Sequence, residues 1–211
     1  MKVFYVKYKR TFFLMILLAA LIIDLIVINI VDGFEEFHIL KTAVDDLIPF
    51  VELSLYTYSY WFLFFILSIV SLYSVKSVGY YKLILGCAVS LIICSVIFLC
   101  YPTTALRPEI TSTGITKNLL TYLYSQSVHA GFPSRSISIA TVSCFYMMIH
   151  VHPQGRQRSH FLSVFSLSSL IIIMLSALFV KQYYLFSVLA GFAVGAFSCL
   201  ITAFIPIERK F

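Results

Sequence analysis

Charged residues are scarce in this sequence. They make up 11% of its 211 residues, whereas about 25% is typical of soluble domains. This scarcity excludes an intrinsically disordered chain, a coiled coil and a soluble protein that binds nucleic acid. Because 61% of the residues are hydrophobic, a folded sphere of this size could not keep its apolar surface away from water. We therefore expect an integral membrane protein, with membrane lipid rather than nucleic acid as its partner.

Metal-binding and disulfide motifs are also missing. The five cysteines have no C-x-x-C spacing, and the five histidines form no H-E-x-x-H or similar ligand set. These absences argue against a disulfide scaffold and a zinc site, so neither a metal nor another cofactor is predicted. We expect the cysteines to act as small packing residues in or at the ends of apolar segments; they are Cys87, Cys94, Cys100, Cys144 and Cys199.

Long apolar runs define six predicted membrane spans. A helix needs about 20 mostly apolar residues to cross the hydrocarbon, and backbone groups in lipid must bond internally, which favours helices. The alternating segments of about 10 residues that mark a β-barrel do not occur. The predicted fold class is all-α, a six-helix membrane bundle formed by a single domain, 1–211. Its spans cover about 11–31, 53–72, 82–101, 134–151, 161–180 and 184–205, with outer loops 32–52 and 102–133.

The distribution of positive charge predicts how the bundle is oriented. Ten Lys and Arg residues lie in or beside the segments on the side of the two termini, and five lie on the opposite side. The positive-inside rule then places both termini in the cytoplasm. The first apolar run could instead be a cleaved signal peptide. Its length of about 21 residues exceeds the usual apolar run of about 7–15, which favours an uncleaved helix.

Three features inside the predicted spans have structural interpretations. Asp24 is costly at its depth and has no obvious partner in the sequence, so we expect an interhelical hydrogen bond rather than a proton relay. Gly191 and Gly195 form a G-x-x-x-G motif, which predicts close packing within the chain and leaves open a homo- or hetero-oligomer. Aromatic residues near the span ends are interpreted as interfacial belts; they are Tyr56, Tyr58, Tyr60, Trp61, Tyr80 and Tyr81.

The outer side carries cations beside helix ends. Arg107, Arg135 and Lys181 all fall there, and Ser134 is placed to cap the fourth helix. The N-terminus of that helix presents free N–H groups and the positive end of its dipole, which together with these cations would suit a phosphate. The alternative is that the cations only touch lipid head groups.

The same segments resemble the type-2 phosphatidic acid phosphatase and haloperoxidase superfamily, in its six-helix membrane branch and near its inositol-phosphorylceramide-synthase-like members. Three family motifs, K-x6-R-P, P-S-G-H and S-R-x5-H-x3-D, have counterparts in the expected order. In the family the Lys, both Arg, the Ser and the glycine amide hold phosphate. The last His attacks phosphorus while the Asp orients it, and the other His protonates the leaving group. Five of the eleven motif positions are kept: Arg107, Pro108, Pro133, Ser134 and Ser176.

The catalytic positions of the family pattern are replaced in this chain. A tyrosine hydroxyl has a pKa near 10, a serine at the orienting position supplies no base, and a serine cannot act as the acid. The resemblance therefore implies that nucleophile, orienting group and acid have all been lost. The replacements are Cys100 for lysine, Arg135 for glycine, Ser136 for the acid histidine, Ala177 for arginine, Tyr183 for the nucleophilic histidine and Ser187 for its aspartate.

These observations lead to a hypothesis and two alternatives. The hypothesis is a membrane protein of the lipid-phosphatase fold that has lost catalysis and binds an anionic lipid head group or acts as a partner subunit. The first alternative is an active lipid phosphatase or head-group transferase that uses other residues, for which His129 and Glu109 are candidates. The second is a small transporter or scaffold. The proposed head-group ligands are Arg107, Ser134, Arg135 and Lys181.

Overall fold

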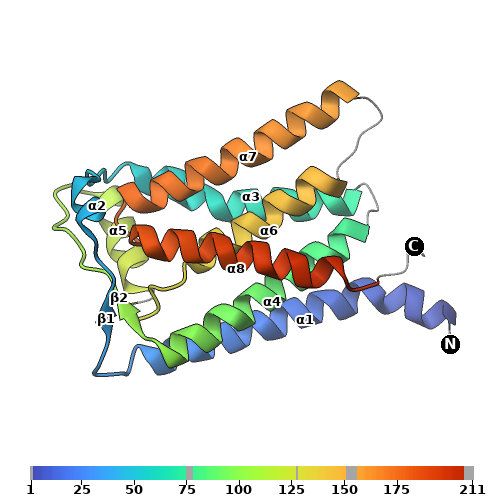
Figure 1. The fold of residues 1–211 in the computed structure, drawn as a ribbon, viewed down its shortest axis with the longest axis horizontal. Coiled ribbons are helices and arrows are strands. Elements are labelled where there is room, and N and C mark those ends of the chain that lie inside the picture. The colour runs from blue at the N-terminus through green and yellow to red at the C-terminus, as the bar shows by residue number, and fades with distance from the viewer. Residues whose placement is uncertain (1, 75–77, 127, 151–155, 207–211) are drawn as a thin grey trace.

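The computed structural model describes residues 2–74, 78–126, 128–150 and 156–206. These residues form eight helices and one sheet of two short parallel strands, arranged as an elongated bundle (Figure 1). In chain order the elements are α1 (Lys2–Val31), β1 (His38–Ile39), α2 (Ala43–Leu47), α3 (Ser54–Ser74), α4 (Val78–Cys100), β2 (Thr103–Thr104), α5 (Ile115–Ser125), α6 (Arg135–His150), α7 (Arg156–Phe179) and α8 (Leu185–Ala203).

Five of the helices are long and apolar enough to cross a membrane. They are α3, α4, α8, and the apolar parts of α1 and α7, at Thr11–Val31 and His160–Phe179. The chain is therefore an all-α, multi-pass membrane protein, as its composition predicts. The predicted fourth span corresponds to α6, which has 16 residues and is shorter than the about 20 that a span usually needs.

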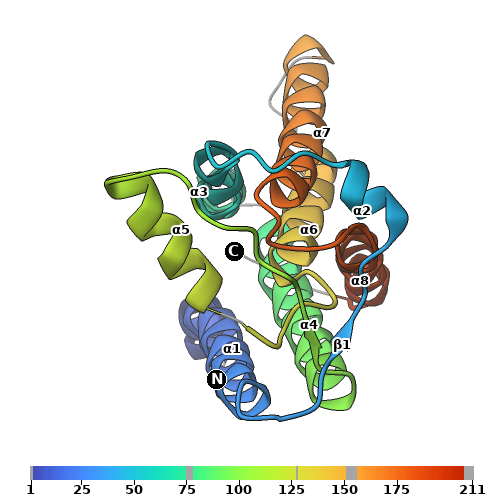
Figure 2. The same ribbon diagram turned by 90° about the vertical axis from the view of Figure 1, so that its left-hand side faces the viewer.

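The bundle has two distinct ends. The loop end carries α2, α5 and the β1–β2 sheet, whereas the terminal end carries the start of α1 and the end of α8 (Figure 1). Figure 2 shows the molecule from the loop end, where α2 and α5 lie on opposite sides of the bundle. Of the long helices, α4 packs against α1, α6 and α8, and α6 packs against α3, α4, α7 and α8. Most of the interior is therefore organised around α4 and α6.

Close packing of α6 against α8 depends on two glycines. A Cβ at Gly191 would fall on the carbonyl oxygen of Ser134, and a Cβ at Gly195 would lie 2.6 Å from the carbonyl oxygen of Ser138. Only glycine leaves room for backbone atoms at this separation. The predicted packing within the chain is therefore seen, and α6 covers the face of α8 that carries the G-x-x-x-G motif.

Three of the tyrosines assigned to interfacial belts are buried, so that interpretation is wrong for them. Tyr58, Tyr80 and Tyr81 are 3–4% exposed. The last two belong to a cluster of buried side chains that includes Leu83 and Tyr146. A buried tyrosine hydroxyl needs a polar partner, and Tyr58 finds one in Ser136 at 2.9 Å.

Asp24 is buried between three helices and fully engaged. Its Oδ2 accepts from Nη1 of Arg135 on α6, and its Oδ1 accepts from Oγ of Ser95 on α4 at 3.1 Å. The predicted interhelical hydrogen bond is confirmed. Its charged partner, Arg135, was not identified from the sequence, and the resulting ion pair satisfies a carboxylate that would otherwise be costly in the bundle interior.

At the loop end, Asp45 joins α2 to α8. Its Oδ2 accepts from the N–H (2.8 Å) and the hydroxyl (2.7 Å) of Thr42, and its Oδ1 accepts from the N–H of Leu185 at 2.8 Å. The last bond satisfies one of the donors that a helix start leaves without an intrahelical partner. Asp45 therefore caps its own short helix and the first residue of α8 at once.

Asp45→Ala is expected to lower the free energy of unfolding by about 1–3 kcal/mol, because it leaves the part-buried N–H of Leu185 without an acceptor. Unfolding in detergent micelles measures the change. Asp46→Ala is the matched control, since Asp46 is exposed and forms an ion pair with the exposed Lys41, and exposed ion pairs contribute little. Equal effects of the two substitutions would contradict this role of Asp45.

Candidate functional site

Segments from three distant parts of the chain meet at the loop end. The start of α6 contacts the start of α8, where the N–H of Ser134 donates to the carbonyl of Ser187 at 2.9 Å. The hydroxyl of Ser136 pairs with that of Tyr58 on α3, whose ring lies edge-on to the ring of Tyr183 at 6.5 Å. The second and third motif segments predicted from the sequence are thus brought together.

Arg107, from the first motif segment, reaches the same region. Its Nη1 donates to the carbonyls of Lys181 (2.9 Å) and Gln182 (2.8 Å) and to the side-chain oxygen of Gln182 at 3.1 Å. Its guanidinium also lies 4.7 Å from the ring centroid of Tyr124 on α5, a cation–π geometry. Gln182 is the residue before Tyr183, so Arg107 adjoins the position where the family pattern has its nucleophile.

The end of α7 explains why these carbonyls face Arg107. The N–H of Gln182 donates to the carbonyl of Ala177, and the N–H of Lys181 donates to that of Leu178, which together form a Schellman motif. Lys181 has a positive φ of 53°, a conformation that glycine adopts more readily. This left-handed residue reverses the chain between α7 and α8 and leaves two carbonyls for Arg107 to bind.

The charge environment of Arg107 differs from that of Arg135. Its hydrogen-bond partners are neutral carbonyl and amide groups, and the two ion pairs found among the described residues involve Lys41 and Arg135 instead. Burial lowers the pKa of the Arg107 guanidinium, because removal from water disfavours the charged form. An arginine keeps its proton nonetheless, so the loop end holds a partly buried positive charge that no carboxylate of the described residues pairs with.

The other two predicted cations also have partners within the chain. Arg135 forms the ion pair with Asp24, and Nζ of Lys181 donates to the backbone carbonyl of Asp45 at 2.6 Å. Burial lowers the pKa of Lys181, while the carboxylate of Asp45 raises it. Both cations therefore lie at the loop end as predicted, but internal contacts already fix part of their hydrogen-bonding capacity.

Ser134 occupies the N-cap position predicted for it. Its Oγ accepts from the N–H of Ile137 at 3.4 Å and lies 3.3 Å from Oγ of Ser136. With Tyr58 these residues form a buried line of three hydroxyls at the positive end of the α6 dipole. The sequence did not identify Tyr58 as part of this group. A tyrosine near a helix end gives the same sequence pattern whether its side chain faces lipid or the protein interior.

Among the described residues, the positions that the resemblance aligns with the family's catalytic residues have no base beside a hydroxyl. Ser136, Tyr183 and Ser187 are all buried, and among the described residues no hydrogen bond or ring contact joins them to a histidine or a carboxylate. Activation of a hydroxyl requires such a base. Ser176, which matches the first position of the third motif, donates its hydroxyl to the carbonyl of Ile173 in its own helix.

The two substitute catalytic residues considered from the sequence lie outside this group of contacts. His129 stacks on Phe37 with ring centroids 4.4 Å apart, and its backbone N–H donates to Asp32 at 2.9 Å. Glu109 is exposed. The carbonyl of His129 accepts from the N–H of Thr103 at 3.0 Å, so its contacts are with the α1–β1 connection and with β2.

No model of a known protein family matches the chain, and no curated protein or solved structure is significantly similar to it. The residues gathered at the loop end are therefore the basis on which a function can be inferred.

Proposed function

We propose that this protein is a six-helix membrane protein with the lipid-phosphatase arrangement, cytoplasmic termini and no catalysis, which binds an anionic lipid head group at its loop end on the non-cytoplasmic side. The observation that carries the proposal is Arg107, a partly buried cation with neutral partners, adjoining the site where the three motif segments meet.

The course of the chain supports six crossings. The start of α1 and the end of α8 lie at the same end of the bundle (Figure 1), which requires an even number of crossings. Five helices qualify as spans by length and composition, and α6 runs between the two ends among them. The proposal makes α6 the sixth, with its shorter length accommodated because α3, α4, α7 and α8 surround it. The excess of Lys and Arg on the side of the termini supports cytoplasmic termini.

The unbalanced charge supports an anion. A charge removed from water is costly unless it is paired, and no carboxylate pairs with Arg107 among the described residues. A phosphate would supply the missing negative charge and could accept from the planar guanidinium in a bidentate geometry. The N-terminus of α6, capped by Ser134, lies at the same loop end and adds a partial positive charge of the kind that binds phosphate.

The absence of catalysis follows from the side chains at the reacting positions. A phosphoryl transfer through this site would need a nucleophile with a base beside it. Tyr183 and Ser136 offer only hydroxyls, and Asp24, the one carboxylate among the described residues that pairs with the start of α6, is neutralised by Arg135. The proposal therefore separates binding, which Arg107 supports, from hydrolysis.

Arg107→Gln is expected to weaken binding of dihexanoyl phosphatidic acid by the purified protein roughly tenfold or more, since a hydrogen bond to a charged group contributes about 1.5–3 kcal/mol. Calorimetric titration in detergent measures the dissociation constant, and dihexanoyl phosphatidylcholine is expected to bind weakly in every variant. Arg107→Lys keeps the charge but not the planar donors, so it should fall between the wild type and Arg107→Gln.

Lys117→Gln is the control, because Lys117 is an exposed cation on α5 at the same end of the bundle. Unchanged affinity in Arg107→Gln, with the variant still folded by thermal unfolding, would overturn the head-group site. Phosphate release from phosphatidic acid by the wild type, lost in Arg107→Gln, would show instead that the protein is an active phosphatase.

A further inference from the structure

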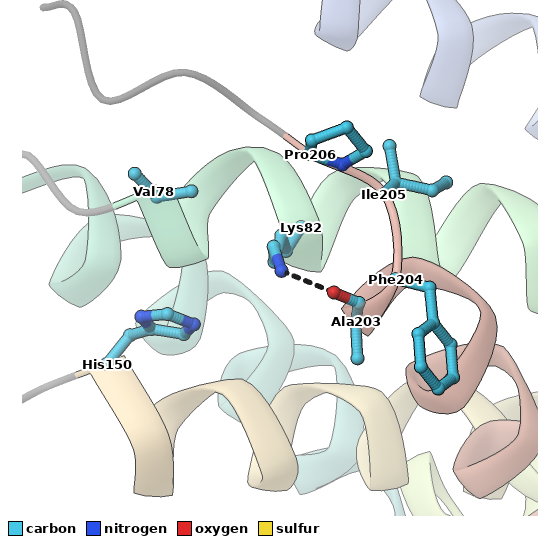
Figure 3. A pocket seen from close by; sticks show the side chains of 7 residues that line it. All are labelled: Val78, Lys82, His150, Ala203, Phe204, Ile205 and Pro206. Atoms are coloured by element: carbon cyan, nitrogen blue, oxygen red, sulfur yellow. Dashed lines mark hydrogen bonds between the residues drawn. The ribbon is translucent and has the colours of Figure 1, made fainter.

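A second site lies at the opposite end of the molecule from Arg107. A pocket of about 510 Å³ opens at the terminal end, where α4 begins and where α6 and α8 end (Figure 3). Lys82 lies between His150 and Phe204 in this view. The residues that line the pocket are Val78, Lys82, His150, Ala203, Phe204, Ile205 and Pro206.

The pocket combines basic and apolar groups. Of the seven described residues that line it, Lys82 and His150 carry basic side chains, and none of the seven is acidic. Nζ of Lys82 donates to the carbonyl of Ala203 at 3.0 Å, which fixes the ammonium at the pocket wall. An ammonium has three donors, so this bond leaves donors for a ligand oxygen.

The backbone of α4 lets His150 reach the pocket. A Cβ at Gly79 would lie 2.5 Å from the Cβ of His150, so only glycine allows the end of α6 to approach the first turn of α4 this closely. The ring of His150 stacks on Tyr146 one turn earlier, with centroids 5.9 Å apart. The imidazole is therefore held against the pocket by packing on two sides.

We propose that this pocket binds the head group of an anionic phospholipid from the membrane leaflet at the terminal end. Lys82 and His150 would face the phosphate, and the apolar residues beside them would contact the glycerol and the first part of the acyl chains. Phe204 is 85% exposed at the rim, which suits contact with lipid. Basic pockets between helices at a membrane surface are recognised sites for acidic head groups.

The distribution of Lys and Arg along the sequence also favours an anionic phospholipid as the ligand. Ten of the 15 Lys and Arg residues belong to the side of the termini by the span assignment, and such an excess attracts anionic lipids to that surface. A soluble phosphate would use the two basic groups but would leave the contacts with Ile205 and Phe204 unused. These apolar contacts distinguish a lipid from a free anion.

Native mass spectrometry of the full chain in detergent tests the proposal, with dioleoyl phosphatidylglycerol as probe and dioleoyl phosphatidylcholine as comparison. We expect the wild type to hold phosphatidylglycerol more tightly, and Lys82→Gln to weaken that binding roughly tenfold or more. Val78→Phe, which fills the pocket and leaves Lys82 in place, should weaken it as well. Lys117→Gln, at an exposed loop-end residue outside both proposed sites, should leave phosphatidylglycerol binding unchanged.

Equal affinity for the two lipids, or unchanged phosphatidylglycerol binding in folded Lys82→Gln, would overturn the proposal. If Lys82→Gln fails to fold because the end of α8 loses its capping ammonium, Val78→Phe decides the question. Inorganic phosphate provides the last comparison. If it raises the unfolding temperature as much as phosphatidylglycerol does, and Lys82→Gln abolishes that rise, the pocket takes a free anion and the lipid assignment is wrong.

Discussion

Replacing Asp24 by alanine is expected to lower the free energy of unfolding by about 3–5 kcal/mol, because it leaves a buried cation without its counter-ion. The side chain of Asp24 is 1% exposed and that of Arg135 is 25% exposed, so the guanidinium would stay in a low-dielectric part of the bundle. Ser95 would lose its acceptor at the same time. Reversible unfolding in mixed micelles, followed by circular dichroism, measures the difference.

A double variant separates the ion pair from simple loss of packing. Asp24→Leu combined with Arg135→Met is expected to recover most of the stability, since removing both members of a buried pair also removes their desolvation penalty. Glu35→Ala, at an exposed acid beyond the end of α1, should leave stability nearly unchanged. Additive effects of the single substitutions at Asp24 and Arg135, with no coupling energy, would show that the two residues do not interact.

The course of the long helices was predictable from sequence. The predicted span 11–31 coincides with the apolar part of α1, Thr11–Val31, and the other long runs fall on α3, α4, α7 and α8 within a few residues. A run of about 20 apolar residues forms a membrane-spanning helix in a bilayer, because its backbone groups must form hydrogen bonds with one another. The alternation of helix direction then placed Arg107, Ser134 and Lys181 at one end, and the structure brings their segments into contact.

The partners of buried residues were not predictable in the same way. Asp24 and Arg135 are 111 positions apart, and their pairing depends on which helices are neighbours, which no local pattern encodes. Tyr58 was misassigned because a helix that is apolar on all sides gives no periodic signal of which face is buried. The five residues of α2 are stabilised by tertiary bonds such as that from Leu185 to Asp45, and helices of this length have little stability of their own.

Adding a methyl group at Gly191 is expected to destabilise the protein by about 3 kcal/mol, at the upper end of the range for overpacked sites. The Cβ of Gly191→Ala would clash with the carbonyl oxygen of Ser134, a backbone atom that cannot rotate away. Helix propensity acts in the opposite direction, because alanine is favoured over glycine by about 1 kcal/mol in a helix interior. The sign of the measured change therefore shows whether α8 packs on α6 as closely as described.

The same substitution tests how the G-x-x-x-G face is used. Ala193→Leu, on an exposed part of α8, adds more bulk towards lipid and should leave stability close to that of the wild type. If this face joined two copies of the chain instead, Gly191→Ala would convert a dimer to a monomer without lowering the unfolding temperature of the monomer. Because Gly191 lies against Ser134, the cap of α6, packing within the chain makes a different prediction: the loss of stability is accompanied by weaker binding of dihexanoyl phosphatidic acid at the loop end.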